Sequence, residues 1–135
     1  MTRFVLDASI AAAWLLPDEE HEHALTVQES LLTSQAIVPP IWWFEICNLL
    51  IMCERRKRHT PAITQAILNA LSDHPIFIED EIDPANLLHL SRLHGLTVYD
   101  ACYLEIAQRH AMPLATLDRK LAAAAVAENV SLFAS

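Results

Sequence analysis

The sequence predicts an α/β fold with a central parallel sheet of four or five strands and helices on both faces. Short apolar runs typical of buried strands alternate with longer segments that carry helix-start and helix-stop signals. The chain has a single glycine, whereas an all-β fold would need many glycines in its turns. At 135 residues, 53% of them hydrophobic, it can bury one sizeable core, so we expect a single domain spanning residues 1–135.

The predicted strands are short and strongly apolar. The first contains Phe4, Val5 and Leu6 and has the pattern of a strand buried on both faces. The second ends at Pro39 and Pro40, because proline cannot continue a central strand. The predicted strands are residues 3–6, 36–38, 75–79 and 114–116, and residues 130–133 are a candidate fifth strand.

Two helices are expected between the first two strands. Ser9 is the expected N-cap of a helix that runs to Leu16 and is stopped by Pro17. Asp18 is the expected cap of a helix to about Leu32, since acids at a helix N-terminus interact favourably with the helix dipole.

The longest predicted helix covers residues 41–58 and is followed by two strong helix starts. Thr60 and Asp83 each precede a proline, a pattern that suits an N-cap followed by proline at the first helical position. The helix after Asp83 is expected to end at Gly95, because glycine readily adopts the left-handed conformation beyond a helix end. The other predicted helices are residues 60–72, residues 99–111 and a short alanine-rich segment that starts at Leu117 or Asp118.

The chain is expected to be cytoplasmic and to bind no membrane. Its longest apolar run, residues 36–46, contains two prolines and Glu45 and is far shorter than the roughly 20 residues that span a bilayer. The N-terminus begins with a strand and lacks a signal-peptide pattern. Cys47, Cys53 and Cys102 have no metal-ligand spacing, so we expect buried, reduced thiols.

The net charge of −8 argues against a large basic surface for nucleic acid and suits a basic protein partner. Two basic groups nevertheless stand out, one at the end of the longest predicted helix and one after the fourth strand. Each could contact phosphates, and each could equally be solvated charge at a helix end. Their members are Arg55, Arg56, Arg58, Arg119 and Lys120.

Four acids stand beside buried apolar segments: Asp7, Glu45, Asp100 and Asp118. Asp7 directly follows the first strand and Asp118 follows the fourth, so both point to the carboxyl edge of the sheet, where ligands bind. Asp100 and Glu45 lie near helix starts that can reach the same edge. Carboxylates among apolar neighbours are costly unless positive charge compensates them, and one hard divalent cation would compensate all four. Mg²⁺ or Mn²⁺ is therefore expected.

Each acid alone also has a structural explanation. Asp7, Asp100 and Asp118 suit helix caps or first turns. Glu45 lies in an apolar helix start, where a buried ion pair would explain it.

Three uncharged polar residues could support the acids. Ser9 and Thr116 each lie two residues from an acid and could hydrogen-bond its carboxylate, although Thr116 also suits an ordinary strand. Asn48 lies one helical turn after Glu45 and could orient it or only satisfy the backbone.

The sequence around the four acids, taken in order, resembles the acidic motifs of PIN-domain nucleases, in particular VapC-type toxins of bacterial type II toxin–antitoxin pairs. The resemblance covers essentially the whole chain, including its length and its order of strands and helices. It implies a Mg²⁺- or Mn²⁺-dependent ribonuclease that acts on RNA, is often a homodimer and is inhibited by a cognate antitoxin protein. The matching segments are Val5-Leu6-Asp7-Ala8-Ser9, Phe44-Glu45-Ile46-Cys47-Asn48, Tyr99-Asp100-Ala101-Cys102-Tyr103 and Ala115-Thr116-Leu117-Asp118.

The resulting hypothesis is hydrolysis of RNA phosphodiester bonds by water that a metal ion activates. Asp7, Asp100 and Asp118 would hold one or two ions, with Glu45 contributing directly or through water. Two other functions stay open: a catalytically inert PIN-like module that binds RNA or protein, and a magnesium-binding phosphoacceptor receiver domain. The receiver fits less well, because it needs paired acids after the first strand and a lysine after the last.

Overall fold

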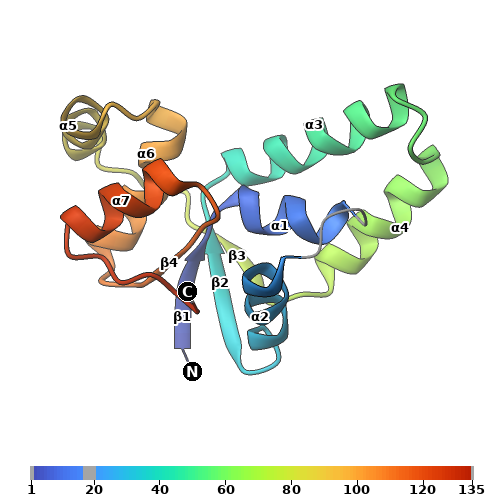
Figure 1. The fold of residues 1–135 in the computed structure, drawn as a ribbon, viewed down its shortest axis with the longest axis horizontal. Coiled ribbons are helices and arrows are strands. Elements are labelled where there is room, and N and C mark those ends of the chain that lie inside the picture. Colours follow the sequence, from blue (N-terminus) through green and yellow to red (C-terminus); the bar gives the residue numbers. More distant parts are fainter. Residues whose placement is uncertain (1, 17–20, 135) are drawn as a thin grey trace.

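Four parallel strands form the centre of the computed structural model, which describes residues 2–16 and 21–134 (Figure 1). They are β1 (Thr2–Leu6), β2 (Ser34–Val38), β3 (Ile76–Ile78) and β4 (Leu114–Ala115). Their order across the sheet is β3-β2-β1-β4, and every neighbouring pair is parallel. The predicted parallel sheet is confirmed, with four strands.

Seven helices surround this sheet within the described residues. They are α1 (Ala8–Leu15), α2 (Glu22–Ser30), α3 (Ile41–Arg55), α4 (Pro61–Ser72), α5 (Pro84–His94), α6 (Val98–Arg109) and α7 (Arg119–Ala127). Figure 1 shows α5, α6 and α7 on one side of the sheet and α1 and α2 on the other, from which α3 and α4 extend outward. Helices cover both faces, as predicted.

The strands of the sheet differ in burial, and the central strand β1 is the clearest buried case. Phe4, Val5 and Leu6 are fully buried, and each such side chain contributes about 1.5–3 kcal/mol when removed from water. The edge strand β3 is different, because Phe77 and Ile78 are about half exposed. The carboxyl end of β1 therefore lies in the buried core, and Asp7, which directly follows it, is buried as well.

The predicted helix caps are observed where proline or glycine defines them. Thr60 accepts a hydrogen bond from the backbone N–H of Ile63, and Asp83 accepts one from that of Asn86. Gly95 follows α5 with a φ of 63°, the left-handed conformation expected there.

Several predicted boundaries are corrected. The long helix ends at Arg55 instead of residue 58, because Lys57 has a φ of 58° and turns the chain. The helix predicted for residues 99–111 begins one residue earlier, capped by the Thr97 side chain, and ends at Arg109. The proposed cap Asp18 lies outside the described residues, and α2 begins at Glu22.

Two further expectations differ from the structure. The fifth strand is reduced to one bridge between Leu132 and Leu114, because β4 is only two residues long and offers little edge to pair with. Cys53 and Cys102 are buried as expected, but Cys47 is exposed on α3.

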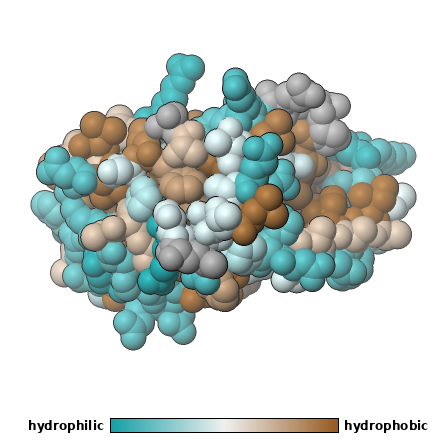
Figure 2. Space-filling view, turned by 90° about the horizontal axis from the view of Figure 1, so that it is seen from below, coloured by the Kyte–Doolittle hydropathy of each residue, from teal (hydrophilic) through white to brown (hydrophobic). Residues whose placement is uncertain are grey.

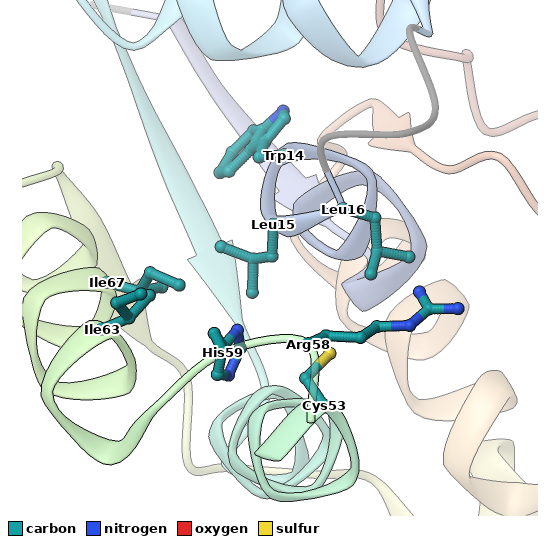
Figure 3. Close-up of a pocket in the computed structure, with 8 residues that line it drawn as sticks. All are labelled: Trp14, Leu15, Leu16, Cys53, Arg58, His59, Ile63 and Ile67. Atoms are coloured by element: carbon teal, nitrogen blue, oxygen red, sulfur yellow. The ribbon is translucent and has the colours of Figure 1, made fainter. Parts of the chain in front are cut away.

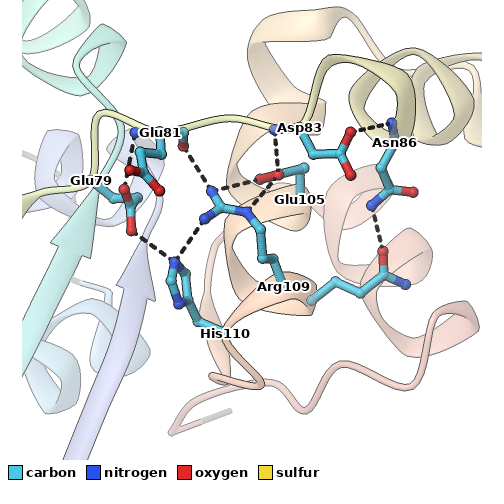
Figure 4. A network of polar contacts seen from close by, with 8 residues as sticks. Glu79, Glu81, Asp83, Asn86, Glu105, Arg109 and His110 are labelled. Atoms are coloured by element: carbon cyan, nitrogen blue, oxygen red, sulfur yellow. Dashed lines mark hydrogen bonds and ion pairs between the residues drawn. The ribbon is translucent and has the colours of Figure 1, made fainter.

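A polar network fixes α6 against the segment that follows β3 (Figure 4). Glu105 is fully buried, and its carboxylate accepts hydrogen bonds from the Nε of Arg109 at 2.8 Å and from the backbone N–H of Asp83 at 2.9 Å. Nearby, His110 and Glu79 form an ion pair of 2.7 Å if the histidine is protonated. The middle and end of α6 are therefore anchored.

Among the described residues, no helix is long and apolar enough to cross a membrane. Figure 2 shows the molecule from the edge where both termini lie, and hydrophilic residues there divide the hydrophobic ones into several separate groups.

Candidate active site

The four acids singled out in the sequence line one cavity at the carboxyl edge of the sheet. Asp7, Glu45, Asp100 and Asp118 all contribute to its wall, and its volume is about 260 Å³. They come from the β1–α1 corner, from α3, from the first turn of α6 and from the N-cap of α7. The fold therefore brings together four acids that are far apart in the chain.

Asp7 is the most buried of the four, with an exposed fraction of 5%. Its Oδ2 accepts hydrogen bonds from the hydroxyl groups of Ser9 at 2.6 Å and Thr116 at 2.7 Å. Asp7 occupies the N-cap position of α1, but its side chain makes no capping hydrogen bond. The cap interpretation is therefore wrong for Asp7, and the same contact corrects the prediction that Ser9 is the cap.

Ser9 and Thr116 also join two corners of the fold. The Thr116 hydroxyl accepts a hydrogen bond from the backbone N–H of Asp118 at 3.0 Å while it donates to Asp7. The Ser9 hydroxyl accepts one from the backbone N–H of Leu117 at 2.9 Å while it donates to Asp7. Each hydroxyl uses its proton and a lone pair at once, so the position of Asp7 is tied to the start of α7.

Asp118 has a structural role as well. Its Oδ1 accepts hydrogen bonds from the backbone N–H groups of Lys120 and Leu121, which caps α7. The cap interpretation is therefore correct for one oxygen of Asp118. The other oxygen, Oδ2, receives no hydrogen bond from the described residues and is free for a ligand.

Glu45 is positioned by a residue that the sequence did not reveal. The hydroxyl of Tyr103 donates a hydrogen bond of 2.9 Å to Glu45 Oε1, and the tyrosine is fully buried. Tyr103 has the pattern of an ordinary core aromatic, although its place one turn after Asp100 on α6 put it near the acids. Glu45 as a residue is exposed and pairs with no cation among the described residues, so the buried ion pair considered for it is absent.

The cavity raises the pKa of two of its acids, Asp7 and Glu45. Burial raises the pKa of Asp7, the charges of Asp100 and Asp118 add to the increase, and the hydroxyl donors oppose it. Burial of its carboxyl end also raises the pKa of Glu45, Tyr103 opposes this, and the charges of Asp7 and Asp100 add to it. The cavity is therefore an environment that lacks positive charge.

The donor groups fit a hard divalent cation. All polar side chains in the cavity wall are carboxylates or hydroxyls, and no His, Cys, Lys or Arg of the described residues lines it. Within residues 2–16 and 21–134, however, no three Asp, Glu, His or Cys side chains are close enough to enclose an ion by themselves. An ion such as Mg²⁺, which retains several waters, needs only one or two direct carboxylate contacts.

The remaining candidates do not line the cavity. Asn48 is exposed and does not line it. Arg55, at the other end of α3, is ten residues from Glu45 in the sequence, or about 15 Å along the helix axis. The Lys120 amine donates a hydrogen bond of 2.6 Å to the carbonyl of Gly95, which ties α7 to the end of α5. Arg56, Arg58 and Arg119 are exposed.

A larger cavity, of about 520 Å³, lies between α1, α3 and α4 (Figure 3). Trp14, Leu15, Ile63 and Ile67 give it mainly apolar walls, and Arg58 lies at its rim. None of the described residues that line it is a carboxylate. The four acids singled out in the sequence all belong to the smaller cavity.

A family model described as PIN domain matches residues 4–127. The chain belongs to the PIN-domain family. Solved structures with the same fold include PAE2754 from Pyrobaculum aerophilum, with a TM-score of 0.67 and 20% identity over 91% of this chain and 84% of that one. FitAcB from Neisseria gonorrhoeae has a TM-score of 0.67 and 17% identity over 96% of both chains. VapBC2 from Rickettsia felis, bound to a DNA fragment from its promoter, has a TM-score of 0.65 and 13% identity over 97% of both chains.

A search of curated proteins found no significant match to this PIN domain. At these identities the solved structures show the fold alone. The arrangement of the acids must therefore support any more specific statement about activity.

Proposed function

We propose that this PIN domain is a metal-dependent ribonuclease of the VapC type, the toxin of a toxin–antitoxin pair. The observation that carries the proposal is the cavity in which Asp7, Glu45, Asp100 and Asp118 meet with no basic residue among its described lining. By itself such a cavity repels RNA phosphates. A bound cation would remove this repulsion and compensate the clustered negative charges of the four acids.

Asp7, Asp100 and Asp118 are the residues that would hold Mg²⁺ or Mn²⁺, with Glu45 contributing directly or through water. When bound, such an ion activates water and stabilises the negative charge that develops on the scissile phosphate and the leaving oxygen. Ser9 and Thr116 keep the Asp7 carboxylate oriented toward this task. Tyr103 occupies Glu45 Oε1, which leaves Oε2 free to accept a proton.

The proposed partner is a cognate antitoxin, and we also propose a homodimer and a cytoplasmic location. Support comes from structures with the same fold whose descriptions name toxin–antitoxin assemblies. One of these is a toxin–antitoxin complex from Klebsiella pneumoniae, with a TM-score of 0.60 and 20% identity over 85% of this chain and 86% of that one. The acidic net charge of −8 favours a basic segment in the partner.

The deciding experiment is cleavage of purified RNA by the purified chain in Mg²⁺, in Mn²⁺ and in a chelator. We expect cleavage only with metal. Asp100→Asn should abolish it, whereas Asp80→Asn, which removes an exposed acid outside the cavity, should cleave as the wild type does.

Equal cleavage by wild type and Asp100→Asn would overturn the proposal. RNA binding without cleavage in either metal would favour the inert PIN-like module. That alternative rests on one observation: no three of the described acids enclose an ion by themselves.

A further inference from the structure

A second pocket, of about 330 Å³, adjoins the acidic cavity. Ile41, Glu45, Thr97, Tyr99 and Asp100 form its wall, which is mostly apolar. Glu45 and Asp100 belong to the walls of both hollows. A ligand held at the carboxylates can therefore extend into the second pocket without leaving the protein surface.

Tyr99 gives this pocket an unusual character. The residue is 61% exposed, although it lies in the first turn of α6 directly before Asp100. Ala101, two residues after Tyr99, is fully buried. The side of α6 that carries Ala101 therefore faces the core, and Tyr99 lies on the side that faces solvent. Large aromatic side chains next to an active site are common platforms for planar ligands.

The charges around the pocket select what can enter it. Glu45 and Asp100 stand at its edge, and none of the described lining residues is cationic, so a phosphate group is disfavoured there. A neutral, flat group suits an aromatic ring and the aliphatic side chain of Ile41. Thr97 accepts a hydrogen bond from the Asp100 backbone N–H, and its own hydroxyl proton stays available for an acceptor on the ligand.

We propose that this pocket binds one nucleobase of single-stranded RNA, stacked on Tyr99, next to the phosphate that lies at the carboxylates. The proposal rests on the proposed function and names its substrate class. A base in a duplex is stacked between its neighbours and cannot enter a side pocket, whereas a base in a loop or a single strand can.

Binding of a fluorescent ten-nucleotide single-stranded RNA in Mn²⁺ tests this proposal. All variants are made in an Asp118→Asn background, which is expected to keep the RNA intact and leaves the pocket wall unchanged, because Asp118 does not line it. Tyr99→Ala should weaken binding by about five- to a hundred-fold, the usual effect of losing one stacked base, and Tyr99→Phe by less than about twofold. Phe44→Ala is the matched control, since Phe44 is an exposed aromatic that does not line the pocket.

Ten versions of the RNA, each with one base removed from its ribose, locate the base that binds. Removal of one particular base should weaken binding to the parent by the same factor as Tyr99→Ala. The Tyr99→Ala protein should be insensitive to that removal, because the two changes delete one interaction. The duplex of the same sequence should bind weakly and equally to both proteins.

Three results would overturn the proposal: equal binding by Tyr99→Ala and its parent, equal losses for Tyr99→Phe and Tyr99→Ala, or equal binding of duplex and single strand. Sedimentation gives a fourth: a dimer that Tyr99→Ala converts to monomer would make the pocket part of a self-interface. Failure of the proposed function is distinct, because absent cleavage by the wild type leaves these binding comparisons unaffected. Continued cleavage with no role for Tyr99 would remove the pocket assignment alone.

Discussion

The two ends of helix α6 hold acids of the same kind in opposite electrostatic settings. At its first turn, Asp100 joins three other acids in a cavity whose described lining has no positive group. Toward its end, Glu105 is fully buried but is paired with Arg109 (Figure 4), and Glu128 on the adjoining α7 side is 2.7 Å from His94. The acids Glu105 and Glu128 pair with Arg109 and His94 and tie helices together. The cavity acids receive hydrogen bonds, but no cation of the described residues lines their cavity. Clustered acids without a cation are typical of ligand sites.

The largest expected effect is on RNA cleavage and comes from neutralising one of the acids in the cavity. Asp7→Asn should reduce metal-dependent RNA cleavage by at least about a hundred-fold, because it removes a proposed metal ligand. It should not lower the metal-free stability, since the amide oxygen can still accept from Ser9 and Thr116 and a buried charge disappears.

Cleavage rates and urea unfolding of wild type and Asp7→Asn in chelator check both parts. Asp80→Asn serves as the control. If Asp7→Asn unfolds at lower urea concentration than wild type yet cleaves RNA normally, Asp7 has a structural role and is not a metal ligand.

Breaking the Glu105–Arg109 pair should lower the stability of the fold and leave RNA cleavage nearly unchanged. Arg109→Ala leaves the Glu105 carboxylate buried with only the backbone donor of Asp83. We expect a loss of about 2 kcal/mol in unfolding free energy, below the usual cost of breaking a fully buried pair because Arg109 is partly exposed. Cleavage per folded molecule should stay within about twofold of wild type.

Urea unfolding and cleavage at low temperature give the two readouts. The matched control is Arg92→Ala, which removes an exposed arginine from the last turn of α5. Equal stability of the Arg109 and Arg92 variants would mean that the Glu105 pair does not anchor α6.

Added Mn²⁺ should also distinguish the cavity acids from the Glu105–Arg109 pair, through its effect on the free energy of unfolding. Mn²⁺ at a hundred times its dissociation constant should stabilise the wild type by about 2.7 kcal/mol, because it binds the folded state only. Arg109→Ala should keep this increment and Asp7→Asn should lose most of it. Thermal unfolding with and without Mn²⁺ measures it, and an equal shift in both variants would place the binding site outside the acidic cavity.

The smallest expected effect is the pH dependence of stability in chelator, where the two groups have opposite signs. The pKa of Asp7 is raised above 3.8, chiefly by burial. The contribution of Asp7 to the free energy of unfolding is therefore fully present below pH 3.8 and is lost as the pH rises through the pKa of the folded state. The pKa of Glu128 is lowered below 4.5, chiefly by its hydrogen bond from His94, so its contribution is present above that pH and is lost as the pH falls through the folded pKa.

Stability curves against pH for Asp7→Asn and Glu128→Gln check these signs. The advantage of Asp7→Asn over wild type should shrink as the pH falls toward 3.8, because the protonated acid is also neutral. The deficit of Glu128→Gln should shrink over the acidic range as well, and it should stay below about 1 kcal/mol because solvent screens this pair. Parallel curves for wild type and Asp7→Asn would contradict a raised pKa at Asp7.

Local chemistry made much of the fold predictable. Thr60 and Asp83 precede prolines, and Gly95 lacks the Cβ atom that makes a left-handed helix end costly, so their conformations follow from a few neighbouring residues. The buried strand β1 follows from its apolar run in the same way. The early end of α3 at Arg55 was less predictable, because it depends on a left-handed φ at Lys57, a residue type that does not favour this conformation.

The candidate site shows the same limit. The strand ends indicated that Asp7 and Asp118 would meet, since β1 and β4 are neighbours in the sheet. The two-residue spacing indicated that Ser9 could hydrogen-bond the Asp7 carboxylate, as it does. It did not reveal that Thr116, from the other end of the chain, would donate to Asp7 as well. Tyr103 was missed for a similar reason: the carboxylate that its hydroxyl binds belongs to Glu45 on α3, which is far from it in the sequence.

The paired hydroxyl groups of Ser9 and Thr116 have one more consequence. They lock Asp7 and the start of α7 to adjacent strands, while Glu45 and Asp100 are carried by the ends of two separate helices. A small tilt of either helix would change the width of the cavity without disturbing any contact within the sheet. A partner that binds α3 or α6 would therefore change the geometry of the proposed metal site without covering the cavity.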